Sequence, residues 1–186
     1  MILPVLIQTP RLQLRTFLQE DAALLYALNA DEPTIRYTGD VPFSSPEAAR
    51  KFIEGYHQYD RYGVGRWTTI RLSDGKPLGW CGLKYHPDAD IYDLGFRFLR
   101  EEWNKGYATE AASACLAFAW NTLHLSRIYA RAMVRNTASI RVLEKLQMTP
   151  EKAITMEGEA AIYSRLPAPS FPKACHNFPV ISLRVV

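Results

Sequence analysis

Residues 102–111 read EWNKGYATEA, and this stretch joins a predicted strand to a predicted helix. A helix that begins directly after a short glycine loop presents unpaired backbone N–H groups, which attract anions such as a pyrophosphate. Gly106 permits close approach to the backbone, and Ala108 keeps the first helical turn narrow. Lys105 and Thr109 can add a charge and a hydroxyl. A turn that only needs a glycine explains the same loop. The absence of GxGxxG disfavours a Rossmann dinucleotide site.

The residues before this loop predict an antiparallel meander. Apolar and polar residues alternate over 66–72, 78–85 and 91–98, as they do in half-buried strands. Ser73-Asp74-Gly75-Lys76 separates the first two runs, and Asp-Gly is typical of a tight hairpin turn. Nearer the N-terminus, a strand is predicted over 12–15 and helices over 20–29 and 44–59.

The residues after the loop predict a helix over 108–123, a strand over 127–134 and a shorter helix over 136–146. A last hairpin is predicted around Glu157-Gly158-Glu159. Asn136 opens the shorter helix, and helix capping explains this residue without any ligand. Its amide can also bond a ligand lying between two diverging strands, and Ser139 can reach the same cleft.

Length and composition indicate an ordinary globular protein. The 186 residues are enough for one domain with a sizeable core, predicted over residues 1–166, and four prolines mark residues 167–186 as a C-terminal tail. A net charge of +3 gives no support for nucleic acid as a partner. No apolar run is long enough for a membrane span, and no secretory signal is recognisable, so we expect a cytoplasmic protein without a membrane partner. Cys81, Cys115 and Cys175 predict reduced thiols, and no Cys/His cluster suggests a metal.

Three motifs together carry a family resemblance. Residues 102–111 resemble the acetyl-CoA pyrophosphate loop of the GNAT superfamily of N-acetyltransferases, and residues 135–146, RNTASIRVLEKL, resemble its second conserved block. Residues 9–15, TPRLQLR, are similar to the first strand of the branch that contains the ribosomal-protein N-terminal acetyltransferases. The resemblance implies a mixed α/β fold with about four helices. It also implies a central, largely antiparallel sheet that splays between its fourth and fifth strands, with acetyl-CoA in the V.

The resemblance also implies roles for individual residues. The Phe98 amide would face the thioester oxygen, and Ser139 would lie near the CoA sulfur as the candidate acid. The cofactor-binding residues would be Phe96, Arg97 and Phe98 on the strand, Trp103, Asn104, Lys105, Gly106, Tyr107, Ala108 and Thr109 in the loop, and Asn136.

The sequence departs from the family pattern at several positions. Trp103 stands where Gln or Arg is common, and Asn104 and Gln147 stand where many relatives have glycine. Leu143 takes the position of the tyrosine acid of many relatives, so the tyrosine route is closed.

The acceptor side is less defined. Asp93 is the candidate general base because it lies on the strand that leads to the cofactor, although a solvated strand carboxylate explains it as well. Asp40 is a weaker alternative. Aromatic residues can line an acceptor cleft or belong to the core: Tyr37, Trp67, Trp80 and Tyr85.

These observations predict an N-acetyltransferase that moves an acetyl group from acetyl-CoA directly to a primary amine. A protein N-terminus and a small-molecule amine are both compatible acceptors. The alternative is a non-catalytic acyl-CoA-binding or sensor module with the same fold. We expect a monomer or homodimer without a metal.

Overall fold

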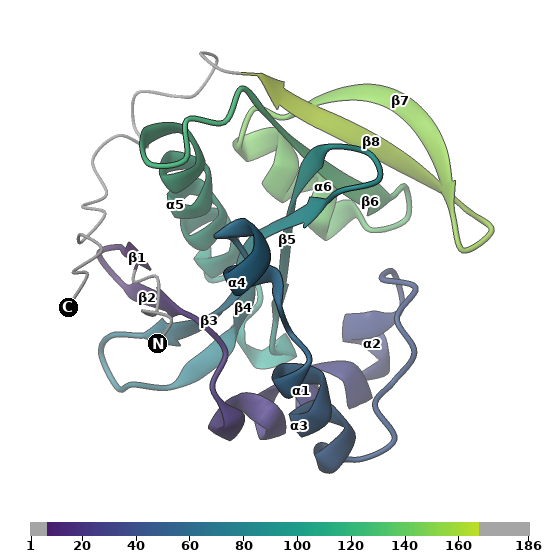
Figure 1. Cartoon of the computed structure of the whole chain (residues 1–186). Coiled ribbons are helices and arrows are strands. Elements are labelled where there is room, and N and C mark those ends of the chain that lie inside the picture. Colours follow the sequence, from purple (N-terminus) through teal and green to yellow (C-terminus); the bar gives the residue numbers. More distant parts are fainter. Residues whose placement is uncertain (1–6, 168–186) are drawn as a thin grey trace.

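The computed structural model describes residues 7–167, and these residues form a mixed α/β fold around one eight-stranded sheet (Figure 1). The strand order is β1-β2-β3-β4-β5-β6-β8-β7, and every neighbouring pair is antiparallel except β5 and β6. The predicted fold class is therefore confirmed. The strands are β1 (Ile7–Gln8), β2 (Leu12–Arg15), β3 (Arg66–Arg71), β4 (Pro77–His86), β5 (Ile91–Phe98), β6 (Arg127–Met133), β7 (Thr149–Met156) and β8 (Glu159–Pro167).

The sheet splays between β5 and β6. These two strands are parallel and pair at a single position, Asp93 with Tyr129, and beyond it their backbones separate (Figure 1). The predicted fourth and fifth strands are β5 and β6, because the two-residue strand β1 precedes the first predicted strand. The chain between β5 and β6 crosses over through a helix, as the connection between parallel neighbouring strands requires.

Four helices of nine or more residues flank the sheet in the described part of the chain, and two shorter ones accompany them. The helices are α1 (Ala22–Ala30), α2 (Glu32–Ile35), α3 (Pro46–Glu54), α4 (Gln58–Tyr62), α5 (Tyr107–Asn121) and α6 (Thr137–Lys145). The helix predicted over 44–59 is divided, because α3 ends at Glu54 and Gly55 follows as its C-cap. The helix predicted over 20–29 corresponds to α1, which ends at Ala30, and Pro33 lies in the first turn of α2, where proline is tolerated.

The two faces of the sheet carry different layers. On one face α5 covers the main core, where Trp67 and the α5 residue Phe118 meet edge to face with their rings 5.5 Å apart. On the other face α1 and α3 enclose a smaller apolar cluster that includes Phe17 and Leu28, and Trp80 packs against it. Because side chains alternate along a strand, successive residues of β4 and β5 face the α5 core on one side and the α1–α3 layer on the other.

Two expectations meet the limits of the described residues. The predicted tail, apart from Pro167 in β8, lies outside them, and so does Cys175. None of the helices in residues 7–167 has the length and apolar composition needed to cross a membrane.

Candidate active site

The open edge of β5 faces the gap between β5 and β6. The Leu99 N–H donates to the Leu78 carbonyl (2.9 Å), and Phe98 lies opposite Gly79 in the same antiparallel ladder. Because backbone groups in such a ladder alternate in direction, the N–H groups of Phe96 and Phe98 point away from β4. These two residues therefore offer unpaired backbone groups at the V, as expected for a strand that binds an extended ligand arm.

Arg97 is arranged differently from its two neighbours. The same alternation turns its backbone toward Trp80 on β4, so its amide does not face the open edge. Its side chain lies on the face opposite α5, 7% exposed, where one Nη donates to the side-chain amide oxygen of Asn29 (2.5 Å) and the other pairs with Asp40. Unlike Phe96 and Phe98, Arg97 thus turns its backbone toward β4 and its side chain toward the cavity.

The loop that leads into α5 has the backbone shape of an anion site. Asn104 and Gly106 both have positive φ angles, 59° and 81°, which turn the chain sharply into the helix. Gly106 is the N-cap and supplies no side-chain hydrogen bond, so the first N–H groups of α5 stay available. A Cβ on Gly106 would lie 3.4 Å from Nη2 of Arg11. The loop therefore presents free N–H groups at the start of α5, and a side chain at position 106 would lie against Arg11.

Trp103 fixes this loop to the end of β5. Its indole Nε1 donates to the Phe98 carbonyl (2.8 Å). This bond satisfies the outward-facing carbonyl of Phe98 and leaves its N–H open. Trp103, the residue that departs from the family pattern, thus holds the loop against β5 at the position where we expect the thioester.

The N-terminal motif meets the loop through Glu110. The Thr9 hydroxyl donates to the Glu110 carboxylate (2.6 Å), and Arg11 Nε lies 2.6 Å from the other carboxylate oxygen. Arg11 also donates to the Lys105 carbonyl (3.0 Å) and lies over the Tyr107 ring, 4.6 Å from its centre. Glu110 therefore ties residues 9–11 to the start of α5, in addition to its favourable position near the helix dipole.

Lys105 does not point freely toward a ligand. Its Nζ lies 2.9 Å from the carboxylate of Glu102, which is 3% exposed. Arg71 and Lys76 contact the same carboxylate at 3.1 and 2.9 Å. The Lys76 and Lys105 bonds hold the pKa of Glu102 down at about 2. Lys105 thus braces the loop at this position.

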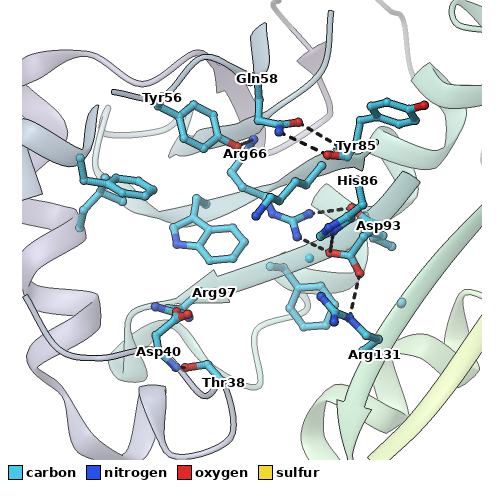
Figure 2. Close-up of a pocket in the computed structure, with 18 of the residues that line it drawn as sticks. Thr38, Asp40, Tyr56, Gln58, Arg66, Tyr85, His86, Asp93, Arg97 and Arg131 are labelled. Carbon is cyan, nitrogen blue, oxygen red and sulfur yellow. Dashed lines mark hydrogen bonds and ion pairs between the residues drawn. The ribbon is translucent and has the colours of Figure 1, made fainter. Parts of the chain in front are cut away.

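A cavity of about 890 Å³ runs from the splay to the face that α1 and α3 cover. Asp93 lines it beside His86 and Arg131 (Figure 2), 6% exposed, with Arg66 Nη2 at 2.5 Å. His86 Nε2 and Arg131 Nε approach the same carboxylate at 3.9 and 3.8 Å. Burial raises the pKa of Asp93, but Arg66, His86 and Arg131 outweigh it, so the net pKa lies below the ordinary value.

Trp80 connects the two buried arginines of the cavity. Its ring lies 5.4 Å from the Arg66 guanidinium and 5.2 Å from that of Arg97. Cations near an indole face are stabilised by the ring quadrupole. Trp80 therefore holds both guanidinium groups in place on the acceptor face.

Asn136 and Ser139 lie across the splay from β5, and both line the cavity. The side-chain amide oxygen of Asn136 accepts from the Ser139 N–H (3.1 Å), so Asn136 caps α6, as the explanation without a ligand predicts. Leu143 on the same helix also lines the cavity, and its apolar side chain cannot donate a proton. The helix thus aligns the Ser139 hydroxyl with the opening between the strands.

The predicted aromatic lining is only partly right. Tyr37, Trp80 and Tyr85 line the cavity, whereas Trp67 is 0% exposed in the core beneath α5. Trp67 and Trp80 lie on strands that pair directly, but they point to opposite faces. Of the two explanations that the sequence leaves open, cleft or core, Trp67 follows the core one.

Sequence reasoning did not select Arg66, His86 or Arg131. Each lies on a strand and on the same face of the sheet as Asp93. Arg66 is 27 residues from Asp93 and Arg131 lies on β6 beyond α5, whereas His86 is separated from Asp93 only by the turn between β4 and β5. The available signal was a charged residue within an otherwise apolar strand, such as Arg66 before Trp67 or Arg131 between two alanines.

Comparison with known proteins agrees with this geometry. The model of the acetyltransferase (GNAT) domain matches residues 11–149. An uncharacterised N-acetyltransferase, p20 from Bacillus licheniformis, is 32% identical over 149 residues, which cover 77% of this chain and 82% of that protein. The crystal structure of a GNAT-family acetyltransferase from Bacillus anthracis superposes with a TM-score of 0.75 at 26% identity, covering 87% of this chain and 98% of that one.

A more distant structure shares the fold alone. RimL, a ribosomal L7/L12 alpha-N-protein acetyltransferase, superposes with a TM-score of 0.74 at 15% identity and covers 89% of this chain and 95% of its own. The resemblance that the three sequence motifs suggested is confirmed by these matches. On the match to residues 11–149, with the splayed sheet and the glycine loop before α5, the chain belongs to the GNAT family of acetyltransferases.

Proposed function

We propose that the protein is an N-acetyltransferase that transfers the acetyl group of acetyl-CoA directly to a primary amine. The observation that supports this most strongly is the single pairing of β5 with β6, which leaves facing edges unpaired beside the N-terminus of α5. When bound, acetyl-CoA supplies an activated acyl thioester. The family match at residues 11–149 supports acetyl transfer in general.

The cofactor residues in this proposal follow from backbone direction. The N–H groups of residues 103–109 would bind the pyrophosphate, where the helix dipole favours negative charge. Phe96 would pair with the pantetheine arm, and the Phe98 N–H would donate to the thioester oxygen as negative charge develops on it. Asn136 and Ser139 would lie on the opposite wall, with the Ser139 hydroxyl near the departing sulfur.

The proton on the acceptor amine must leave before its nitrogen can attack. A carboxylate with a lowered pKa accepts a proton weakly, and Asp93 has such a pKa. We therefore propose that Asp93 positions the acceptor ammonium next to the imidazole of His86, whose Nε2 lies 3.9 Å from the Asp93 carboxylate. The neutral imidazole of His86 can take the proton and pass it to water in the cavity. The new C–N bond replaces the C–S bond, and the thiolate takes a proton from Ser139 or water.

The thiols are consistent with a cytoplasmic enzyme. Cys81 and Cys115 are buried and form no disulfide, and the Cys115 thiol donates a hydrogen bond to the Cys81 sulfur 3.7 Å away. Reduced thiols are typical of reducing compartments.

The direct experiment is a thiol-release assay with acetyl-CoA and a panel of peptide N-termini and small amines, with mass spectrometry of the products. We expect thiol release that depends on an amine and an acetylated product. Binding of acetyl-CoA with no product from any amine would support the non-catalytic binding module. Absence of both binding and turnover would refute both proposals.

A further inference from the structure

The acceptor side of the cavity carries more positive than negative charge. Five cationic side chains line the cavity against three carboxylates, which leaves an excess of two positive charges. The carboxylates are Asp40, Asp88 and Asp93, and the cations are Arg61, Arg66, Lys84, Arg97 and Arg131. A polycationic acceptor such as a polyamine would meet this excess unfavourably.

Two of the arginines are already occupied. Arg66 donates to the carbonyls of Gly82 (2.5 Å) and Asp93 (2.8 Å) as well as to the Asp93 carboxylate. Arg97 is held by Asn29 and Asp40, as a buried guanidinium–carboxylate pair. The Asp40 pair also shows that this cavity accommodates a carboxylate beside a guanidinium.

Arg131 is the cation beside Asp93 that remains available to bind a ligand. Its side chain is 41% exposed, and its contact with Asp93 is long, 3.8 Å, because Arg66 already holds that carboxylate at 2.5 Å. Arg61 and Lys84 are exposed and form no ion pair with any residue of the described range. The Asp93 carboxylate thus faces the guanidinium groups of both Arg66 and Arg131, and these three side chains together carry one excess positive charge in the cavity.

We propose, building on the proposed acetyl transfer, that the acceptor is an amine that also carries a carboxylate, and that Arg131 binds this carboxylate. Arg131 lies beside Asp93 on the same face (Figure 2), so an ammonium at Asp93 puts a carboxylate a few bonds away within reach of Arg131. A guanidinium binds a carboxylate with paired hydrogen bonds, which fixes orientation as well as affinity. The carboxylate belongs either to a free amino acid or to an acidic side chain near a peptide N-terminus.

The test compares acceptors that differ only in charge. Steady-state rates are measured for amino acids and their carboxamides, and for peptides with an acidic or an amide residue at the second position. We expect kcat/KM to be about tenfold higher or more for the carboxylate member, as for the loss of one charge-assisted hydrogen bond. A preference among the amino acids identifies a small-molecule acceptor, and one among the peptides identifies an N-terminus. Equal rates within every pair, or a preference for spermidine, overturn the proposal.

Variants assign the effect to Arg131. Arg131→Met should raise KM for the carboxylate acceptor about tenfold, leave the KM for acetyl-CoA nearly unchanged, and abolish the preference within each pair. Arg131→Lys should restore part of the preference. Arg141→Met, an exposed arginine of α6 that does not line the cavity, is the matched control and should behave as the unaltered protein. A preference that survives Arg131→Met contradicts the assignment.

Calorimetry separates this proposal from the proposed function. The same acceptor pairs are titrated into the protein saturated with CoA. If no amine is acetylated, the proposed function fails, but tighter binding of the carboxylate member still supports the acceptor inference. Equal affinity or no binding for both members overturns it.

Discussion

Two non-glycine residues take left-handed backbone conformations where many relatives have glycine. Asn104 has a φ of 59° and Gln147 a φ of 60°. Asparagine tolerates this region because its short amide bonds locally, whereas glutamine has no such advantage. Both turns are thus closed by residues other than glycine that hold a left-handed backbone conformation.

Replacing Gln147 with glycine should stabilise the protein. Gln147 closes the C-terminus of α6, where its N–H donates to the Glu144 carbonyl (2.9 Å). Glycine removes the left-handed strain at the cost of some unfolded-state entropy, so we expect the free energy of unfolding to rise by about 0.5–1 kcal/mol. Urea unfolding measures it. Gln147→Ala keeps the strain and should give no gain, and a loss with glycine would contradict the argument.

The Ser139 hydroxyl should matter to turnover more than to binding. If it protonates or positions the departing thiolate, Ser139→Ala should lower kcat by about 10²-fold, the low end for a general acid, with a smaller change in acetyl-CoA affinity. Thr137→Ala removes a hydroxyl from the same helix end outside the cavity and serves as the control. Parallel losses in kcat and affinity for Ser139→Ala would indicate a binding role instead.

Asp93→Asn should act on the amine side of the reaction. Asparagine keeps the size but removes the charge that holds the ammonium and His86, so kcat/KM should fall. The loss should shrink as pH rises, because free amine then becomes abundant without assistance. The measurement is the pH profile of kcat/KM for both proteins. A pH-independent loss would contradict this role, because it would mean that Asp93 does not assist removal of the proton from the acceptor ammonium.

At the scale of elements, periodicity was enough to locate the long strands and helices. The strands predicted over 66–72, 78–85 and 91–98 match β3, β4 and β5 to within about a residue at each end. The short elements β1, α2 and α4 were missed, because two to five residues contain too little of a period to detect. Gly55 was read as part of one helix, although it ends α3.

The candidate site was predictable mainly where one segment contains it, although Asp93 was also selected from its strand. The loop before α5 and the start of α6 were found because their residues are consecutive. The contact of Thr9 with Glu110 joins residues 101 positions apart, and the pair Arg66–Asp93 joins two strands. Such contacts depend on how the sheet is assembled, which one sequence does not reveal.

The glycine loop should control cofactor affinity. Gly106→Val adds a branched side chain at the helix end where the phosphates are expected, so the dissociation constant for CoA should rise at least about tenfold. Gly75→Val is a matched control, because Gly75 also has a positive φ, 69°, in the β3–β4 hairpin with nothing within 4 Å of an added Cβ. Calorimetric titration compares the two. Normal CoA binding by folded Gly106→Val would show that the loop is only structural.

At the scale of the whole molecule, two carboxylates should make stability sensitive to acid. The pKa values of Asp93 and Glu102 are lowered in the folded protein, that of Glu102 to about 2. Their stabilisation is complete above the unfolded pKa values, about 4, and is lost as the pH falls through the lower folded values.

Melting temperature measured between about pH 5 and pH 2 should therefore fall. Glu102→Gln should lower the melting temperature at neutral pH and make this fall shallower. Glu101→Gln, at a neighbouring carboxylate 60% exposed, is the control and should change neither. A pH dependence that Glu102→Gln leaves unaltered would contradict the pairing with Lys76 and Lys105.

The most direct test of the account is the thermal stability of the protein with and without acetyl-CoA. A ligand that binds only the folded state at about 100 times its dissociation constant adds about 2.7 kcal/mol, so saturating acetyl-CoA should raise the melting temperature by several degrees. CoA should do the same, and Gly106→Val should lose most of the shift. An unchanged melting temperature at saturating acetyl-CoA and CoA would contradict the claim that the opening between β5 and β6 is an acetyl-CoA site.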